Sequence, residues 1–556
     1  MEQGRVLIAI ALSFAVFFVW NFFFVEKPEV EQQQPMETAA PVEEKQVPSA
    51  TTSSEASPEK PSDAFVASEK SSFKGSAEAR IITVKTPLYT VRISENGAVF
   101  KSFELEHYKE HSDKNSALKN LLDPENGGQN MKVSFAGGNL AGLATAVFNA
   151  DDSGDTIIVS DMARTLTFTW QSESGVVVEK QFTFSPQTYL IDMGLIIKNG
   201  SGSAFTDRAV VEIQHALPQK KGGYAFEGPS AVLNGKLEQI KVKKIEDNSR
   251  LSGTFGWLAI EDRYFMRSLI PAEPVDGVMT LAVKGDDVVV SQLQQPERAF
   301  LPGETVSYGY KVFFGPKSMQ LLNTLGYDLG KAVQFGMFSF IAKPLLWFMN
   351  FIYSVIPNYG VAIIILTIVT KIVLWPLGNK SYKSMSEMKK IQPLMAELRE
   401  KYKNDKKQMN QELMGLYKTY KINPMGGCLP MVLQIPVFFA LYRMLYSAIE
   451  LRHTPFVLWI TDLSAPDRLF EFGFTVPFMQ PPYGIPVLTL VMGATMFLQQ
   501  KMSPPPGDPA QAKMMMLMPV VFTFIFINFS SGLVLYWLIN NVLSIAQQYY
   551  IQKKYA

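Results

Sequence analysis

A single lysine interrupts a long apolar stretch of the sequence. The run YGVAIIILTIVTKIVLWPL, residues 359–377, is long enough to cross a bilayer as a helix, and Lys371 is its one charged residue. Thr367 and Thr370 precede it by four residues and by one, which predicts that all three side chains share one side of the helix. A charge inside a membrane segment is costly and tends to mark function. Two hypotheses follow: Lys371 extends to the membrane surface, or it faces a water-filled cavity.

Polar side chains also occur in other apolar runs. Gln434, Gln500, Tyr536 and Trp537 lie in three further stretches and form no catalytic grouping. Gln434 could bond a neighbouring helix or face a wet cavity. Polar groups spread in this way over several helices, together with Thr367, Thr370 and Lys371, predict a shared hydrophilic hollow.

Other chemistries have little support in the composition. The 556 residues carry a formal net charge of +1, one cysteine (Cys428) and four histidines without metal-ligand spacing. The phosphate-binding pattern G-x-x-x-x-G-K-[ST] does not occur. We therefore expect no catalytic residues, no metal site, no cofactor, and neither a covalent reaction nor nucleotide hydrolysis.

Long apolar runs predict six membrane spans. The fifth is short, and the NFSSG sequence after it predicts a tight hairpin with the last span. The six spans are predicted at residues 1–25, 359–377, 424–451, 485–502, 514–532 and 533–551.

Basic residues give the orientation of these spans. Residues 378–423 contain eleven Lys or Arg against five acids, whereas residues 452–484 contain only two Arg. The positive-inside rule then places the first loop in the cytoplasm and the second outside. Both termini, the 503–513 loop and the 552–556 tail are predicted to be cytoplasmic.

The N-terminal part of the chain predicts an external β domain on a tether. Residues 1–25 read as an uncleaved anchor rather than a signal peptide, because no small-residue cleavage site follows at the expected place. Residues 26–80 are rich in Glu, Pro, Ser, Thr and Ala, which is typical of a flexible segment. From 81 to 330, apolar and polar residues alternate around Asn-Gly and Ser-Gly turns, which predicts antiparallel strands in a sandwich.

Two segments between the spans leave alternatives open. Residues 335–356 could form another span, but crossing there would place the basic loop outside, so we predict an amphipathic interfacial helix at 331–358. Residues 378–423 show apolar positions at three- and four-residue steps on both sides of KND (403–405), which predicts a cytoplasmic coiled-coil hairpin. It either only joins two spans or forms a basic arm for an anionic partner such as ribosomal RNA or lipid headgroups.

Four motifs resemble a known family. The sequences IQPLMAELREKY, NPMGGCLPMVLQIPVFFALYRML, LQQKMSP and SSGLVLYWLINN resemble the YidC/Oxa/Alb family of membrane protein insertases, in its long Gram-negative form. The resemblance implies a polytopic α-helical membrane protein with a five-helix core, plus an external β-supersandwich domain of a fold shared with sugar-processing enzymes. It implies a multi-pass monomer in the bacterial inner membrane, with the β domain in the periplasm.

The resemblance also implies a mechanism and partners. A groove open to the cytoplasm would hold a positive charge, usually arginine in the family, which falls on Lys371 here by alignment on the following WPL. The groove partners map to Gln500 and Trp537, and with them Gln434 and Tyr536. The implied partners are nascent membrane proteins, the Sec translocon and its accessory proteins, the ribosome, the signal recognition particle receptor and anionic lipids.

Two rival functions fit less of the sequence. A solute transporter would also place a charge in a polar cavity, but internal repeats and broken-helix pairs are not evident. An anchored sugar enzyme would need only one span and would leave the other five unexplained.

Overall fold

The computed structural model describes residues 79–113, 115–122, 129–216, 225–285, 287–420, 429–503 and 509–555. The predicted anchor and nearly all of the predicted tether lie outside these residues. The first part of the predicted third span, residues 424–428, also lies outside them.

Residues 81–316 form a β domain, as the alternating sequence predicts. The strands are β1 (Ile81–Lys85), β2 (Tyr89–Ser94), β3 (Val99–Lys109), β4 (Leu118–Asn120), β5 (Lys132–Phe135), β6 (Asn149–Ala150), β7 (Thr156–Ile158), β8 (Arg164–Gln171), β9 (Val176–Phe184), β10 (Leu190–Asn199), β11 (Phe205–Asp207), β12 (Ala209–Ala216), β13 (Gly228–Leu233), β14 (Lys236–Gln239), β15 (Arg250–Glu261), β16 (Phe265–Pro271), β17 (Val275–Lys284), β18 (Val288–Gln294), β19 (Arg298–Phe300) and β20 (Thr305–Pro316). Short 3₁₀ turns occur at Leu143–Thr145 and Val242–Lys244.

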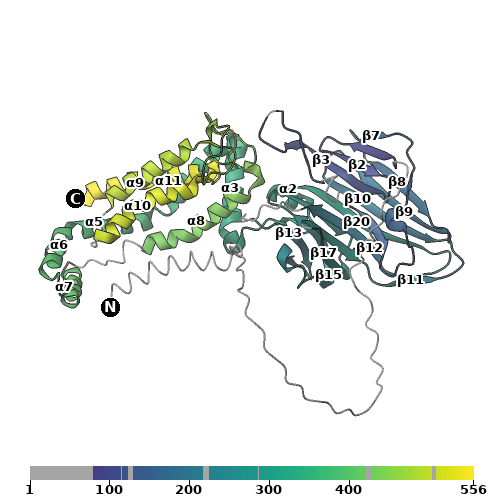
Figure 1. The fold of residues 1–556 in the computed structure, drawn as a ribbon, viewed down its shortest axis with the longest axis horizontal. Helices are drawn as coiled ribbons and strands as arrows, with labels where there is room; N and C mark the ends of the chain where they lie inside the picture. Colours follow the sequence, from purple (N-terminus) through teal and green to yellow (C-terminus); the bar gives the residue numbers. More distant parts are fainter. Residues whose placement is uncertain are drawn as a thin grey trace, which may run out of the picture. The chain divides into compact units, whose positions relative to one another are not determined.

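Two sheets carry the core of this domain (Figure 1). The smaller has the order β4-β3-β2-β1-β7, and the larger runs β5-β12-β18-β17-β15-β16-β20-β10-β9-β8-β6, with β13 and β14 attached to β15. Ring contacts join them: Phe100 on β3 lies 5.0 Å from Phe182 on β9, and Phe103 lies 5.4 Å from Phe314 on β20, between ring centroids. The apolar faces of the two sheets therefore pack against each other as a sandwich.

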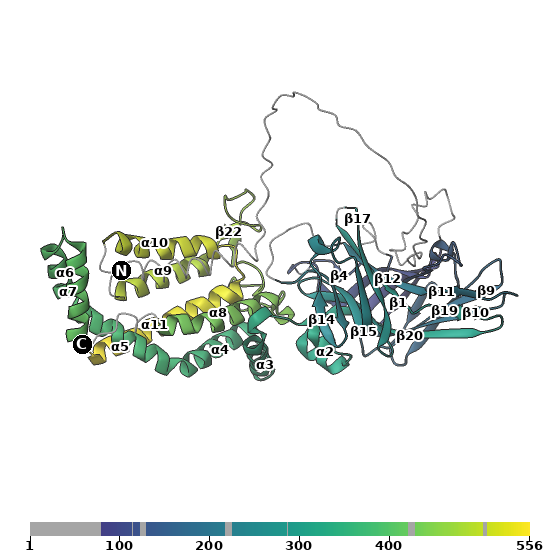
Figure 2. The same cartoon turned by 90° about the horizontal axis from the view of Figure 1, so that it is seen from below.

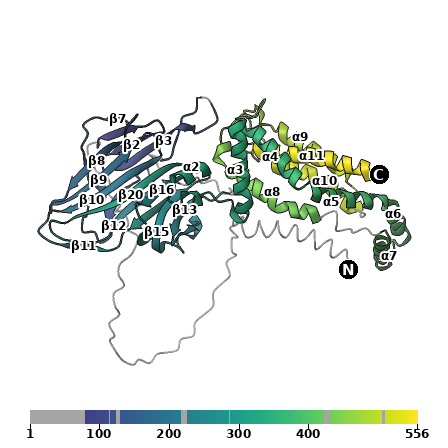
Figure 3. The same cartoon turned by 180° about the vertical axis from the view of Figure 1, so that it is seen from behind.

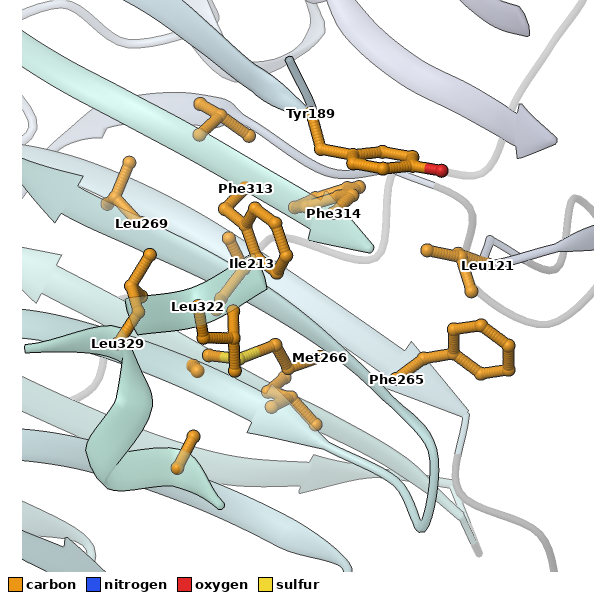
Figure 4. Packing of buried hydrophobic residues seen from close by; sticks show 14 of the residues in the cluster. Leu121, Tyr189, Ile213, Phe265, Met266, Leu269, Phe313, Phe314, Leu322 and Leu329 are labelled. Atoms are coloured by element: carbon orange, nitrogen blue, oxygen red, sulfur yellow. The ribbon is translucent and has the colours of Figure 1, made fainter. Parts of the chain in front are cut away.

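A short helix extends this core. In α2 (Met319–Leu325), Leu322 is fully buried, and Leu329 in the 3₁₀ turn that follows (Leu329–Ala332) is also fully buried. Figure 4 shows both leucines beside Phe313 and Met266 of the large sheet. The apolar edge of the domain is thereby covered by the chain that leads out of it.

A lysine occupies one position in the core of this domain. Alternate residues of β9 are buried, and Lys180 falls on the buried face with 1% of its surface exposed. Its ammonium donates to the carbonyls of Gly97 (2.7 Å), Ala98 (3.2 Å) and Met131 (2.8 Å). Burial lowers the pKa of Lys180 to about 7, because a charge in the core loses its hydration.

Helices make up the rest of the described chain. They are α3 (Ser339–Val355), α4 (Tyr359–Val373), α5 (Trp375–Lys390), α6 (Gln392–Lys401), α7 (Lys406–Thr419), α8 (Leu429–Ser447), α9 (Val487–Met502), α10 (Pro509–Phe526) and α11 (Ser531–Tyr555). Two 3₁₀ turns, Gly336–Phe338 and Ile449–Leu451, and the strands β21 (Leu469–Glu471) and β22 (Gly484–Ile485) complete the elements.

The helix α11 is the centre of this helical part. It packs against α4, α5, α8 and α9, and α9 packs in turn on α10 (Figures 2 and 3). Gly493 on α9 makes the second packing close, since a Cβ there would lie 2.1 Å from Thr523 Oγ1 on α10. Any larger residue at Gly493 would force the Thr523 side chain or the helices themselves to move.

The predicted span at 359–377 is bent in the structure. The helix α4 ends at Val373, and α5 starts at Trp375 with an axis turned by 66°. Pro376 occupies the first turn of α5, where its missing N–H is tolerated. The bend separates an apolar segment from the lysine-rich segment that follows it.

Length and composition single out few membrane-crossing helices among the described residues. Gly336–Val355 is long and apolar enough to cross, and the bent pair α4–α5 passes the same test as a unit. Ala512–Phe526 is apolar but shorter. These criteria alone do not give the six spans predicted from the sequence, and the interfacial position predicted for residues 331–358 stays a prediction.

The helices α6 and α7 pack side by side after α5. Ile391, Met395 and Leu413 form their small buried core, and the Tyr417 hydroxyl contacts Met395 Sδ at 3.8 Å. The Asp405 side chain caps α7 by accepting from the backbone N–H groups of its first turn. The basic residues of this segment surround a narrow apolar seam.

Candidate functional site

Lys371 lies in the last turn of α4 and is turned into the helical core. The Asn358 side chain caps the start of α4 by accepting from Val361 N–H, and the apolar run carries the helix on to Val373. Only 8% of the Lys371 surface is exposed. Its Nζ donates to Ser544 Oγ on α11 at 2.6 Å, which joins two helices far apart in the sequence.

The two threonines predicted to share its face differ in burial. Thr367 is 1% exposed, one turn before Lys371, whereas Thr370 is only half-buried. Each hydroxyl donates to a carbonyl one turn earlier, Thr367 to Ile363 at 2.6 Å and Thr370 to Leu366 at 2.7 Å. Their donors are therefore used within α4, and only their oxygen lone pairs remain for another group.

Ser544 is the centre of a polar cluster that spans four helices. It accepts from Lys371 and donates to the Asn540 carbonyl of its own helix at 2.7 Å. Tyr382 on α5 hydrogen-bonds both Ser544 and Gln499 on α9. The sequence prediction of site residues missed Ser544 and Tyr382.

More polar side chains of α11 extend this cluster on both sides of Ser544, from Asn541 to Gln548. Asn541 donates to Thr495 Oγ1 on α9 at 3.3 Å, and Gln547 donates to Asn379 Oδ1 on α5 at 2.9 Å. Gln548 donates to Ser503 Oγ at 3.4 Å. Asn541, Ser544 and Gln548 recur at three- and four-residue steps, so the periodicity of α11 carried a signal for these positions.

Trp537 lies on the same stripe of α11 as Ser544, two turns earlier, or roughly 10 Å along the helix. Its ring contacts Phe438 of α8 (4.7 Å between centroids), Phe526 of α10 (4.9 Å) and Phe522 of α10 (6.3 Å). The stripe is therefore aromatic toward the N-terminal end of α11 and polar toward its C-terminal end.

The remaining predicted residues are distributed around this axis. Tyr536 is 7% exposed on another face of α11. Gln434 on α8 and Gln500 on α9 are half-buried. The structure thus joins Lys371 to α11 directly and places Trp537 on the same stripe, while Gln434, Gln500 and Tyr536 come from three helices of the same bundle.

The buried charge of Lys371 has no opposite charge paired with it in the described part of the chain. Within the described part of the chain, no carboxylate forms an ion pair with Lys371, and its partner is a neutral hydroxyl. A carboxylate acceptor adds the Coulomb attraction of opposite charges to the hydrogen bond, which a neutral hydroxyl does not supply. An incoming carboxylate would therefore compete well with Ser544 for the ammonium.

A separate cavity of about 830 Å³ lies elsewhere, lined by strands of the β domain and by Arg452, His453 and Asp462 of the α8–α9 loop. Asp262 lies in the wall of this cavity. Burial by itself would raise its pKa, but the Arg267 guanidinium, 3.3 Å away, and hydrogen bonds from two backbone N–H groups hold the pKa below its usual range. Arg267 also donates to the Leu121 carbonyl. Asp262 and Arg267 are therefore paired with each other and with backbone groups.

Comparison with known proteins agrees with both parts of the chain. The model of the 60Kd inner membrane protein family matches residues 351–556, and that of the YidC periplasmic domain matches residues 81–348. Membrane protein insertase YidC of Syntrophus aciditrophicus (strain SB) is 40% identical over 99% of each chain. YidC of Syntrophobacter fumaroxidans (strain DSM 10017 / MPOB) is 43% identical over 84% of this chain and 86% of that one.

A solved structure is also similar. It is described as an active YidC insertase with the first transmembrane domain resolved, and it is 18% identical, covers 85% of this chain and 95% of its own, and has a TM-score of 0.37.

The fold and the polar cluster define a class: an integral membrane protein in which a β domain precedes a helical core with a buried basic residue. Full-length identity near 40% narrows this class. The chain belongs to the YidC family of membrane protein insertases.

Proposed function

We propose that the chain inserts integral proteins into the inner membrane and helps them fold and assemble, alone or with the Sec translocon. Incoming segments would enter a hydrophilic groove that is open to the cytoplasm and has Lys371 at its centre. The groove would also include Thr367, Thr370, Gln434, Gln500, Tyr536 and Trp537, together with Ser544 and Tyr382.

One observation carries this proposal: Lys371 is buried in a helical core with a neutral partner. A charge kept there without a carboxylate is expensive. This free-energy cost is offset if the ammonium binds an anion while the protein acts on its substrate. The acidic or polar flank of a membrane protein in transit supplies such an anion.

Transfer of the polar flank is the step that requires assistance. Moving about 20 apolar residues from water into lipid is favourable without an energy source. The barrier lies in carrying the flank across. A cationic, hydrated half-channel lowers that barrier, since it replaces part of the flank's hydration and attracts its negative charge.

The aromatic part of the α11 stripe supports a groove that is closed at one end. Trp537 packs with Phe438, Phe522 and Phe526, whereas the polar cluster begins at Asn541, about one turn further along the helix, and has its centre at Ser544, about two turns further. With α11 oriented by the positive-inside rule, the polar end faces the cytoplasm. A flank held at Lys371 would then have to pass the aromatic cluster to leave the groove.

We further propose the six-span topology with both termini in the cytoplasm and the β domain in the periplasm. In this topology α3 lies in the outer interface, and its outward rings Phe340, Trp347 and Phe351, which are 53–74% exposed, contact lipid. The basic hairpin formed by α6 and α7 would contact the ribosome, the signal recognition particle receptor or anionic lipids.

Insertion of a reporter with an acidic N-terminal flank, in cells depleted of the native insertase, tests the proposal. Lys371→Ala should reduce flank translocation strongly, and Lys371→Arg should restore it, since Arg keeps the charge. Lys343→Ala on α3 is the matched control, because it removes one lysine from a neighbouring apolar helix. Wild-type insertion by Lys371→Ala, at equal protein level, would refute the electrostatic role.

A further inference from the structure

The loop that joins α8 to α9 exposes large apolar side chains. Phe470, Phe474 and Phe478 follow one another at four-residue steps and are 71%, 65% and 87% exposed, and Leu458 in the same loop is 85% exposed. From Leu469 to Ile485, Glu471 is the one charged residue. A segment with a single charge and this much exposed apolar surface marks an interaction site.

Three of these side chains stand on left-handed backbone. The φ angles of Leu458, Phe470 and Phe478 are 58°, 56° and 64°. Bulky residues rarely adopt this region, where Gly or Asn would fit with less strain. The folded loop holds this strain, so the outward direction of these three side chains is a built feature.

A polar hub holds the loop to the ends of the helices. Arg468 donates to the carbonyls of Pro482 (2.8 Å) and Ile527 (2.9 Å). Asn528 donates to the Phe478 carbonyl at 2.8 Å, and its own oxygen accepts from Gln480 N–H at 2.8 Å. These hydrogen bonds therefore fix the loop beside the turn that follows α10.

A second anchor fixes the loop to the start of α9. The Asp467 carboxylate accepts from Leu488 N–H at 2.6 Å and from the Trp459 indole at 2.5 Å. The neighbouring turns of α9 and α10 expose Leu490 (50%) and Phe524 (60%). In a membrane protein these outward apolar faces contact lipid, and the rings of the loop continue them.

We propose that the α8–α9 loop is a lipid anchor, which inserts Phe470, Phe474 and Phe478 into the leaflet at that end of α9 and α10. The surface it recognises is the apolar interior just below the phospholipid headgroups, and no headgroup charge is required. The anchor would hold the ends of α9, α10 and α11 at a constant depth. The proposal does not depend on insertase activity.

Environment-sensitive fluorescence on the full chain in liposomes tests this anchor. In a Cys428→Ser background, Phe478→Cys carries an NBD label, and Phe474→Cys provides a second labelled position. Lys403→Cys, exposed between α6 and α7, is the control. The liposomes are phosphatidylcholine with or without 5-doxyl phosphatidylcholine as a quencher.

The anchor predicts blue-shifted emission at 478 and 474 and at least a twofold loss of intensity with the doxyl lipid, while 403 keeps water-like emission. Water-like, unquenched emission at both loop positions would overturn the proposal. A blue shift that follows the protein-to-lipid ratio and resists the quencher would also overturn it, because a second copy of the chain would then cover the rings.

Discussion

Lys371 on α4 and Ser544 on α11 are joined by a hydrogen bond of 2.6 Å, although 173 residues separate them in the sequence. The contact gives the buried ammonium a neutral partner and positions it beside the polar end of α11. Because Ser544 on α11 also hydrogen-bonds Tyr382 on α5, its environment reports on α4, α5 and α11 at once. The predictions about the site follow from this pair.

Replacing Ser544 with Asp should disable the site without removing the lysine. The new carboxylate would form a charge-assisted bond with Lys371 and occupy the place of the incoming acidic flank. We expect about tenfold less translocation of an acidic flank, which corresponds to roughly 1.4 kcal/mol. A protease-protection assay on the depleted cells measures it.

Ser544→Ala is the matched control for this substitution. It removes the resting partner but leaves the charge free, so acidic-flank translocation should stay within about threefold of wild type. Equal losses for Ala and Asp would show that Ser544 matters for packing rather than for the charge of Lys371.

Trp537 should contribute strongly to the stability of the helical core. Trp537→Ala removes a ring packed on Phe438 and Phe526, and such truncations cost about 3–5 kcal/mol in well-packed cores. Trp347→Ala is the control, because that ring is 63% exposed on α3. Unfolding in mixed detergent micelles compares the two; similar losses would contradict the packing assigned to Trp537.

The close approach of α9 and α10 should make Gly493 sensitive to a single methyl group. Gly493→Ala places its Cβ against Thr523, so the Thr523 side chain or the helices must move and the protein should lose stability. Gly415→Ala on α7 has open space and should be neutral or slightly stabilising, by about 0.5–1 kcal/mol from helix propensity. Melting temperatures of the two purified variants give the comparison, and equal shifts would contradict the close packing.

Lys180 should make the stability of the β domain depend on pH. Its pKa is about 7 in the fold because of burial, and near 10.5 in the unfolded chain, so the unfolded state binds more protons between these values. Stability should therefore rise with pH above about 7, by up to about 1.4 kcal/mol per pH unit from this group.

Lys180→Met removes this titration. Hydrogen exchange of β9 in the full-length protein, measured from pH 7 to 9, should show the protection of wild type rising relative to the Met variant. A constant difference between the two would contradict the role of burial at Lys180.

The sequence predicted the parts of the fold that depend on local periodicity. The alternation in VVVEKQFTF predicted a half-buried strand, and β9 has that pattern. The same alternation places Lys180 in the core, but its three carbonyl partners lie about 50 to 80 residues away and could not be derived locally. Contacts of this kind depend on the sheet arrangement rather than on the strand.

The candidate site shows the same division. Lys371 and Thr367 follow from one helical face, and the structure buries both. Ser544 and Tyr382 come from other helices, and pairing them with Lys371 requires the packing of α11 on α4 and α5. Ser544 was not predicted; the spacing of Asn541, Ser544 and Gln548 could have indicated an inward-facing position, but nothing local names its partner. The bend after Val373 was not predicted, because the predicted span at 359–377 runs through Pro376; this proline is the residue that could have indicated it.

A charge-swap experiment tests the central claim most directly. Translocation is measured for reporters with acidic and with basic flanks, each with wild-type protein and with Lys371→Glu. If Lys371 attracts the flank by its charge, Lys371→Glu should lower the acidic reporter and raise the basic reporter relative to wild type, with a coupling of at least tenfold between the two changes. If both reporters change by the same factor, Lys371 does not act through its charge and the account is contradicted.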